Sequence, residues 1–272
     1  MNTRAIKAII QRDLRIITKT KGVLWPMIIV PLVMLVVVPT IILVIPAVEL
    51  GIASELDELG AMIGSLPEGL RQSLASYTPE QQWIVVTVLY LLAPMYLIAP
   101  LMVASVIAAD SFAGEKERKT LEALLYTPTT DLELYLAKLL SAWLPAVAIA
   151  WIGFVIYGLV VNIGGWPVMR RVFFPNLTWV LLAVWVSPAI AAFSLGVSVL
   201  VSVRVSSFQE AYQMGAIVVV LVVALMIGQL AGVLVFSPGL VAVMGAVLWA
   251  VDAVLLWVGG RSFQRGQVLA RI

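Results

Sequence analysis

The sequence predicts an all-α integral membrane protein with six transmembrane helices, an N-terminal amphipathic interfacial helix and a helical cytoplasmic segment between spans 2 and 3. The chain of 272 residues is 62% hydrophobic and 12% charged, whereas soluble domains are roughly 45–50% apolar and about 25% charged. Six apolar stretches are each long enough to cross a bilayer as a helix. They cover residues of about 23–48, 83–109, 139–161, 177–201, 214–236 and 240–260, within one transmembrane domain of residues 1–272.

The chain contains no histidine and no cysteine. Their absence removes disulfides, thiol nucleophiles, imidazole acid–base chemistry and the usual zinc and haem ligands. No Gly-Lys pair occurs, so the phosphate-binding loop G-x-x-x-x-G-K-[ST] is also missing. We therefore expect no catalytic residue, no metal site and no cofactor in this chain, and any ATP that drives it must bind to a different polypeptide.

Residues 1–21 predict an amphipathic helix that lies along the membrane surface. Its apolar side chains recur on one helical stripe: Ile6, Ile9, Ile10, Leu14 and Ile17. Its polar and basic side chains lie mostly on the other side: Arg4, Lys7, Gln11, Arg15 and Lys19. A basic amphipathic helix next to a span is typical of a segment held in the headgroup layer by anionic lipid. The alternative is a solvated basic tail.

The first span contains or is bounded by Pro26, Pro31, Pro39 and Pro46. Proline frees backbone carbonyls that lipid cannot satisfy, so we expect this helix to be kinked and packed against protein at those points. Residues 49–82 follow as an acidic extracytoplasmic segment. Its apolar residues still repeat at helical spacing, which favours one or two short helices over a plain loop.

The 110–138 segment is the longest polar interruption of the chain and has the pattern of two helices with a break between them. Three leucines of the first helix recur at helical spacing: Leu121, Leu124 and Leu125. The first helix ends at Thr127-Pro128, because the residue before a proline avoids the helical region. Thr130 and Glu133 form the pattern of a capping box that starts the second helix, which leads into span 3.

The ordered pattern of this segment indicates that its leucine face binds a partner. The alternative is that the leucines lie on the membrane surface or against the ends of neighbouring spans. Two further interruptions are shorter: residues 162–176, with turn and aromatic residues suited to the interface, and the polar hinge 203–213.

Six spans place both termini on one side of the membrane, and the distribution of basic residues decides which side. Fourteen of the 17 Lys and Arg residues lie in the N-terminal segment, the 110–138 segment, the 203–213 hinge and the tail. We therefore expect a multi-pass cell-membrane protein with both termini in the cytoplasm.

Asp252 is the ionisable residue that lies clearly within a predicted span. A charge in hydrocarbon costs several kcal/mol, so such residues often contact a substrate or control a conformational change. The alternative is a carboxyl group that is protonated or hydrogen-bonded to a neighbouring helix. The lack of a second ionisable residue within a span favours this structural alternative.

Three motifs resemble those of the membrane subunits of ABC-2 type ABC transporters. Residues Gly114–Glu122 read GEKERKTLE and continue as ALLYTP, similar to the family's E-[RK]-x-x-G-T-L-E-x-L-L-x-[TS]-P run after span 2. The Glu133–Lys138 element matches its E-x-x-x-x-K pattern, and Ser207–Ala211 matches S-x-x-E-A. Lys119 departs from the family pattern, which usually has glycine there.

The resemblance implies the permease subunit of an ATP-driven exporter that forms its translocation pathway as a dimer with a second copy or a related permease. Separate ATP-binding subunits would hold ATP and Mg, membrane lipid would surround the chain, and nucleic acid is not an expected partner. The helix after span 2 would be the coupling helix that contacts the ATPase. Its candidate residues are Glu115, Glu117, Arg118, Thr120, Leu121, Glu122, Leu124 and Leu125, with Ser207 and Glu210 in the second hinge.

Two other functions fit the same span pattern. A six-span secondary transporter or channel would work without an ATPase. A membrane scaffold that signals through its cytoplasmic loop would bind partners without transport.

Overall fold

The computed structural model describes residues 3–47, 63–64, 68–118, 130–202, 205, 207–231 and 234–262. Within these residues the secondary structure is helical, and no strand occurs. Six helices are long and apolar enough to cross a membrane: Leu24–Val44, Ala93–Glu117, Asp131–Met169, Leu177–Ser202, Phe208–Leu230 and Pro238–Arg261. The prediction of an all-α chain with six transmembrane helices is therefore confirmed.

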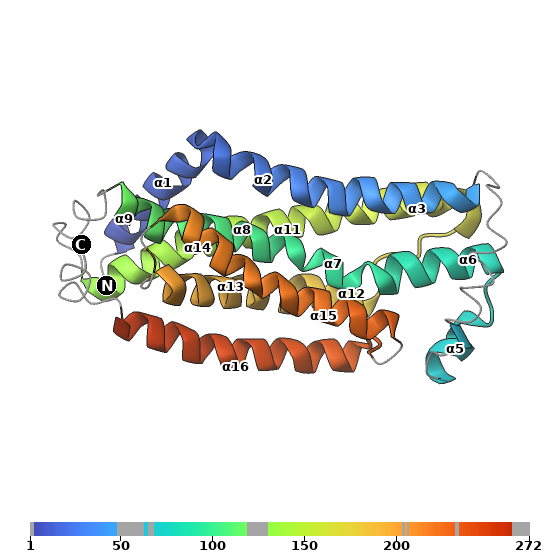
Figure 1. The fold of residues 1–272 in the computed structure, drawn as a ribbon. Coiled ribbons are helices and arrows are strands. Elements are labelled where there is room, and N and C mark those ends of the chain that lie inside the picture. The colour runs from blue at the N-terminus through green and yellow to red at the C-terminus, as the bar shows by residue number, and fades with distance from the viewer. Residues whose placement is uncertain are drawn as a thin grey trace.

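The spans lie side by side in an elongated bundle (Figure 1). Its helical elements are α1 (Thr3–Lys19), α2 (Lys21–Leu32), η1 (Val33–Val37), α3 (Val38–Ala47), α5 (Glu68–Leu74), α6 (Pro79–Ile84), η2 (Val85–Leu91), α7 (Ala93–Tyr96), α8 (Ile98–Ala109), η3 (Asp110–Gly114), α9 (Glu115–Glu117), α11 (Asp131–Met169), α12 (Leu177–Leu181), η4 (Leu182–Val186), α13 (Ser187–Ser202), α14 (Phe208–Gly215), η5 (Ala216–Val218), α15 (Val219–Leu230) and α16 (Pro238–Ser262).

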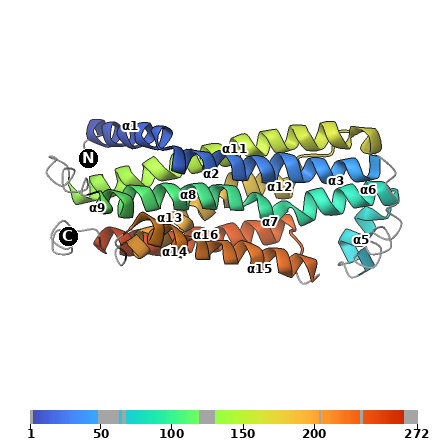
Figure 2. The same cartoon turned by 45° about the horizontal axis from the view of Figure 1, so that its top comes forward.

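The two ends of the bundle differ. Helices α1, α9 and α14 lie at one end, on the left of Figure 1, and we call it the charged end. Helices α5 and α6 lie at the opposite end, on the right, and the same arrangement is visible in Figure 2. The charged end thus brings together the N-terminal helix, the end of span 2 and the beginnings of spans 3 and 5.

Span 2 forms the centre of the bundle. In the apolar window of Ala93–Glu117, 94% of the residues are buried, against 28% for span 1 and 22% for each of spans 5 and 6. Small residues allow α8 and α13 to approach closely. Across this contact the Oγ atoms of Ser105 and Ser194 are 2.6 Å apart, and Ser194 also donates to the carbonyl of Leu101.

Four π-helical segments interrupt the spans: η1, η2, η3 and η4. Three of them end two or three residues before a proline, at Pro39, Pro94 and Pro188. Proline has no N–H and its ring crowds the carbonyl four residues earlier, so the preceding turn widens. In a membrane the freed carbonyls need other donors.

Side chains supply donors to each π-helical segment. In η2 the Tyr157 hydroxyl donates to the Val88 carbonyl at 2.7 Å, and the Trp179 indole donates to the Leu89 carbonyl at 2.8 Å. In η4 the Trp151 indole donates to Ala183. The donors to the remaining two segments are Thr40 in η1, and Arg118 and Lys138 in η3.

The third span is longer than the sequence predicts. Helix α11 begins at the predicted capping box, where Glu133 N donates to Thr130 Oγ1 at 3.3 Å and Thr130 N donates to the Glu133 carboxylate at 3.0 Å. It then continues to Met169, so the turn predicted within 162–176 starts eight residues late, at Arg170 with φ 53°.

Packing explains why α11 does not stop at its glycines. A Cβ on Gly164 would lie 2.9 Å from Leu43, and one on Gly165 would lie 2.9 Å from Phe173. These glycines therefore allow close contact with span 1 and with the returning chain, and do not form a turn. The Asn162 side chain holds that returning chain, accepting from Phe173 N and Phe174 N.

Candidate functional site

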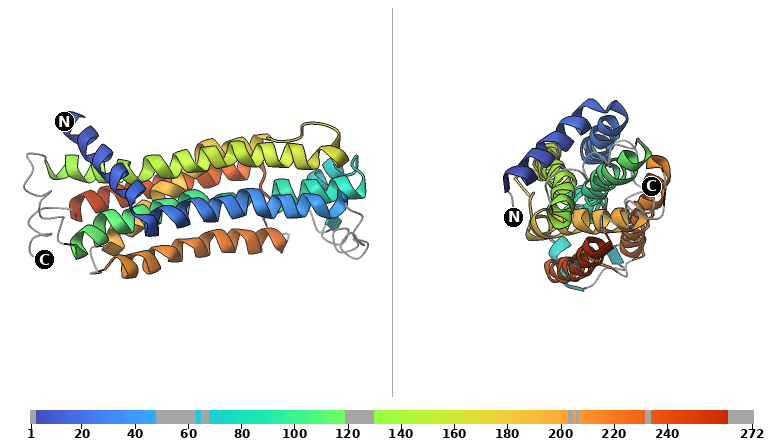
Figure 3. Two further views of the ribbon diagram at one scale, coloured as in Figure 1. Left: turned by 90° about the horizontal axis from the view of Figure 1, so that it is seen from above. Right: turned by 90° about the vertical axis from the view of Figure 1, so that its left-hand side faces the viewer.

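The most highly charged buried region of the described chain lies where α1, the end of span 2 and the start of α11 meet at the charged end. Helix α1 crosses α11 there at an angle, as the two views in Figure 3 show. The stripe predicted for α1 packs against the bundle through Ile6, Ile9 and Ile17, which are buried in one apolar cluster with residues of α8 and α11.

Lys138 is the centre of this region. Its side chain is fully buried, and its Nζ lies 2.6 Å from Glu115 Oε2, 2.9 Å from the Ser111 carbonyl and 3.9 Å from Asp13 Oδ2. A buried ammonium is stable only when it is paired and its hydrogen bonds are made. The π-helical turn η3 contributes by leaving the Ser111 carbonyl available to accept from this amine.

Two more side chains complete the cluster. Arg12 donates from Nη2 to Glu115 Oε1 at 3.3 Å and from Nη1 to Asp13 Oδ1 at 3.5 Å. Ser141 donates to Asp13 Oδ2 at 3.2 Å. Arg12, Asp13, Glu115 and Lys138, which we call the ion network, carry two positive and two negative formal charges. The network links the N-terminal helix to spans 2 and 3.

A second ion pair lies at the end of span 2, beside the ion network in the sequence. Arg118 Nη1 donates to Asp110 Oδ1 at 2.9 Å across the π-helical turn. Gly114 lies beneath this pair, and a Cβ there would be 3.0 Å from Asp110 Oδ1 and 3.2 Å from Arg118 Nη1. Glycine at this position therefore lets the arginine fold back over the end of span 2.

The residues of α9 contact the second hinge. Glu117 accepts a hydrogen bond of 2.8 Å from the N–H of Phe208, and Lys116 Nζ donates to the Val205 carbonyl at 3.4 Å. Ser207 caps α14 by accepting from Glu210 N at 3.2 Å. Two of the orphan N–H groups at the start of α14 thus receive acceptors, one of them from the end of span 2.

A comparison with protein-family models gives a match over residues 8–237 to the ABC-2 family transporter protein. The matched part is well over half of the chain and contains the ion network. The chain belongs to the ABC-2 transporter family. No curated protein and no solved structure matches it.

As an ABC-2 permease, the chain is a multi-pass membrane transport subunit. Of the predicted coupling residues on the helix after span 2, the structure describes Glu115, Glu117 and Arg118. Each of them forms a hydrogen bond to another part of the same chain: Glu115 to Arg12, Glu117 to Phe208 and Arg118 to Asp110. The other predicted coupling residues lie outside the described residues: Thr120, Leu121, Glu122, Leu124 and Leu125. Ser207 and Glu210 also lie at the charged end, where they form the N-terminal cap of α14.

Asp252 of the permease lies apart from the ion network. It is on α16, whose last residue, Ser262, lies at the charged end. Asp252 is ten residues before Ser262, which is about 15 Å along the helix. Its side chain is 1% exposed, and neither carboxylate oxygen has a hydrogen-bond partner among the described residues. The sequence left open that Asp252 is hydrogen-bonded to a neighbouring helix, and no such bond to a described residue is present.

Three residues of the ion network are not among the site residues that the sequence predicts: Arg12, Asp13 and Lys138, of which Lys138 enters only as the end of the Glu133–Lys138 motif. Asp13 lies on the apolar stripe of α1, four residues from Ile9 and Ile17, and it is the one acidic residue among the first 48. Lys138 lies between apolar residues in the first turns of span 3. For Asp13 the available signal is a charge on a face that periodicity predicts to be buried, and for Lys138 it is a charge among apolar residues at the start of a span.

Proposed function

We propose that this chain is the permease subunit of an ATP-driven exporter, working as a dimer with separate ATP-binding subunits that dock at the charged end. Family membership supports the transporter class. The ion network is the observation that carries the coupling proposal, because it links the start of the predicted coupling helix, where span 2 ends, to span 3 and to α1.

Movement can pass through this region in a defined way. Glu115 lies on α9, at the start of the predicted coupling helix, and contacts both Lys138 on α11 and Arg12 on α1. Glu117 of the same short helix contacts the start of α14. Closure of the ATPase subunits on ATP would displace the coupling segment, and these contacts would carry the displacement to spans 2, 3 and 5.

The orientation follows from charge. Most of the basic residues belong to segments that meet at the charged end, and basic residues favour the cytoplasmic side. ATP is available there to a separate subunit. The proposed cytoplasmic face therefore coincides with the face that carries the predicted coupling segment.

Co-purification tests the coupling proposal. A candidate ATP-binding subunit, sought among the genes that neighbour the one for this chain, is expressed with it, and complex formation is measured by pull-down through the permease. Replacing Leu124 and Leu125 by Asp should abolish the complex, because charged side chains cannot bury in an apolar groove. Leu132→Asp is the matched control, since Leu132 is 57% exposed in the first turn of α11, before the stretch 139–161 that the sequence predicts to cross the membrane.

Retention of a normal complex by the double variant would overturn the coupling-helix assignment. A reconstitution experiment separates the alternative function. Transport by the chain alone in vesicles, at a rate that does not change when the ATPase and ATP are added, would identify a secondary transporter or channel.

A further inference from the structure

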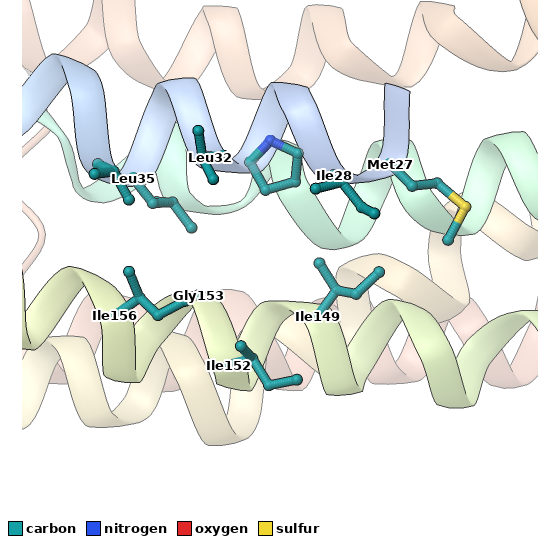
Figure 4. Close-up of a pocket in the computed structure, with 10 residues that line it drawn as sticks. Met27, Ile28, Leu32, Leu35, Ile149, Ile152, Gly153 and Ile156 are labelled. Atoms are coloured by element: carbon teal, nitrogen blue, oxygen red, sulfur yellow. The ribbon is translucent and has the colours of Figure 1, made fainter. Parts of the chain in front are cut away.

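An apolar groove of about 220 Å³ runs between span 1 and span 3 on the outside of the bundle (Figure 4). Every residue that lines it is apolar. Leu32 of α2 and Ile152 of α11 form its rims and are 52% and 59% exposed. At its floor the two helices touch, since a Cβ on Gly153 would lie 2.6 Å from Leu35 Cδ1.

The groove has the length of one leaflet. It extends along span 1 from Met27 to Val36, a rise of about 14 Å at 1.5 Å per residue. Half of a hydrocarbon core about 30 Å thick is about 15 Å. Because the span begins at Leu24, near the charged end, the groove lies in the leaflet on that side.

Basic side chains lie on the last turns of α1, which precede the groove in the chain. Helices α1 and α2 meet at Thr20, seven residues before Met27. Arg15 and Lys19 are exposed on the last turns of α1, and neither forms an ion pair with any described residue. Each cation near a membrane surface attracts anionic lipid by about 1 kcal/mol.

The dimensions of the groove argue against other occupants. Pockets for drug-sized ligands measure roughly 300–1,000 Å³, which exceeds this groove. An interface between two copies needs roughly 1,000 Å² of buried surface and a face wider than a groove of ten residues. A single acyl chain is long, narrow and apolar, and it is present at this depth in any bilayer.

We propose that the groove binds one acyl chain of an anionic phospholipid whose phosphate lies at Arg15 and Lys19. The lipid is then a bound structural partner of the junction between α1, α2 and α11, distinct from a transported cargo. It also covers the side of α1 opposite to the ion network, because Arg15 and Lys19 are exposed while Asp13 is buried.

Native mass spectrometry of the purified full chain counts the lipid directly. The protein in mild detergent is mixed with dioleoylphosphatidylglycerol or dioleoylphosphatidylcholine, and bound lipid is measured. Ile152→Trp fills the groove and should remove the phosphatidylglycerol adduct. Val155→Trp should retain it, because Val155 is also 59% exposed on α11 but does not line the groove.

A charge variant separates the headgroup from the tail. Arg15→Gln with Lys19→Gln should weaken phosphatidylglycerol binding by about fivefold for each cation removed and leave phosphatidylcholine binding unchanged. Lys7→Gln is the control, since Lys7 is exposed on α1 twelve residues before Lys19.

Three outcomes would overturn the proposal. One is equal phosphatidylglycerol binding by the two tryptophan variants, and another is equal binding of both lipids by the unaltered chain. The third is an Ile152→Trp chain that binds lipid normally but shifts from dimer to monomer, because the groove would then be an interface between copies.

Discussion

At the scale of single residues, the charged end depends on Lys138. Its ammonium group lies between two buried carboxylates, 2.6 Å from Glu115 and 3.9 Å from Asp13. The net contribution of such a cluster to stability is small, because desolvation opposes the Coulombic attraction. Removing one member is a different matter, since it leaves buried charge without its counter-charge.

Lys138→Met should therefore lower the free energy of unfolding by about 3–5 kcal/mol, measured by thermal or denaturant unfolding in detergent. Adding Glu115→Gln should restore part of this loss, because it removes the one negative charge that Arg12 does not balance. Lys7→Met, at an exposed position of α1, should be close to neutral. A Lys138→Met chain as stable as Lys7→Met would show that the network is not held together by its charges.

Sequence patterns reached part of this network. The motif after span 2 predicts Glu115 as a site residue, whereas Arg12 and Asp13 belong to no motif and Lys138 is only the end of the Glu133–Lys138 element. The reason is physical, because periodicity places a charge on a buried face but does not identify its partner. Asp13 and Lys138 are 125 positions apart, and only the crossing of α1 over α11 brings them together.

At the scale of elements, the π-helical segments are the feature that a 3.6-residue period cannot predict. Prolines predict freed carbonyls in the spans, and η1, η2 and η4 are found just before three of them. In η2 and η4 the donors that satisfy these carbonyls come from other helices and are far away in sequence, whereas Thr40 of the same span donates to η1. Tyr157 of α11, for example, reaches Val88 of η2.

Tyr157→Phe should lower the free energy of unfolding by about 1–3 kcal/mol, because it leaves the buried Val88 carbonyl without its donor while the ring is kept. The measurement is unfolding in detergent, compared with Tyr212→Phe. Tyr212 is half-buried, keeps its ring against Phe208 and has no hydroxyl hydrogen bond to a described residue. Equal stability of the two variants would mean that the π-helical turn does not depend on this donor.

At the scale of the whole molecule, composition predicts six spans and the segments that share an end, but not which span is central. Every span is apolar enough for lipid, so hydropathy alone does not distinguish a lipid-facing helix from a buried one. Span 1 has a mean hydropathy of 3.0, and 28% of the residues in its most apolar part are buried. Span 2 has a mean hydropathy of 1.8, and the corresponding share is 94%. The lower hydropathy and the small residues of span 2 were the available signals.

The orientation of the whole bundle is open to a direct test, because the chain has no cysteine and any introduced thiol is the only one present. Arg71→Cys places a thiol at the end of the bundle that carries α5, and Lys7→Cys places one on α1 at the charged end. Both positions are exposed, and the Arg71–Glu68 surface pair contributes little to stability.

A membrane-impermeant maleimide should label Arg71→Cys in intact cells and Lys7→Cys only after permeabilisation, as detected by gel shift. This result is expected because basic residues concentrate at the charged end and hold it in the cytoplasm. The cysteine-free chain gives the background. Labelling of Lys7→Cys in intact cells, with Arg71→Cys protected, would invert the bundle and place the predicted coupling segment where no cytoplasmic ATPase could bind it.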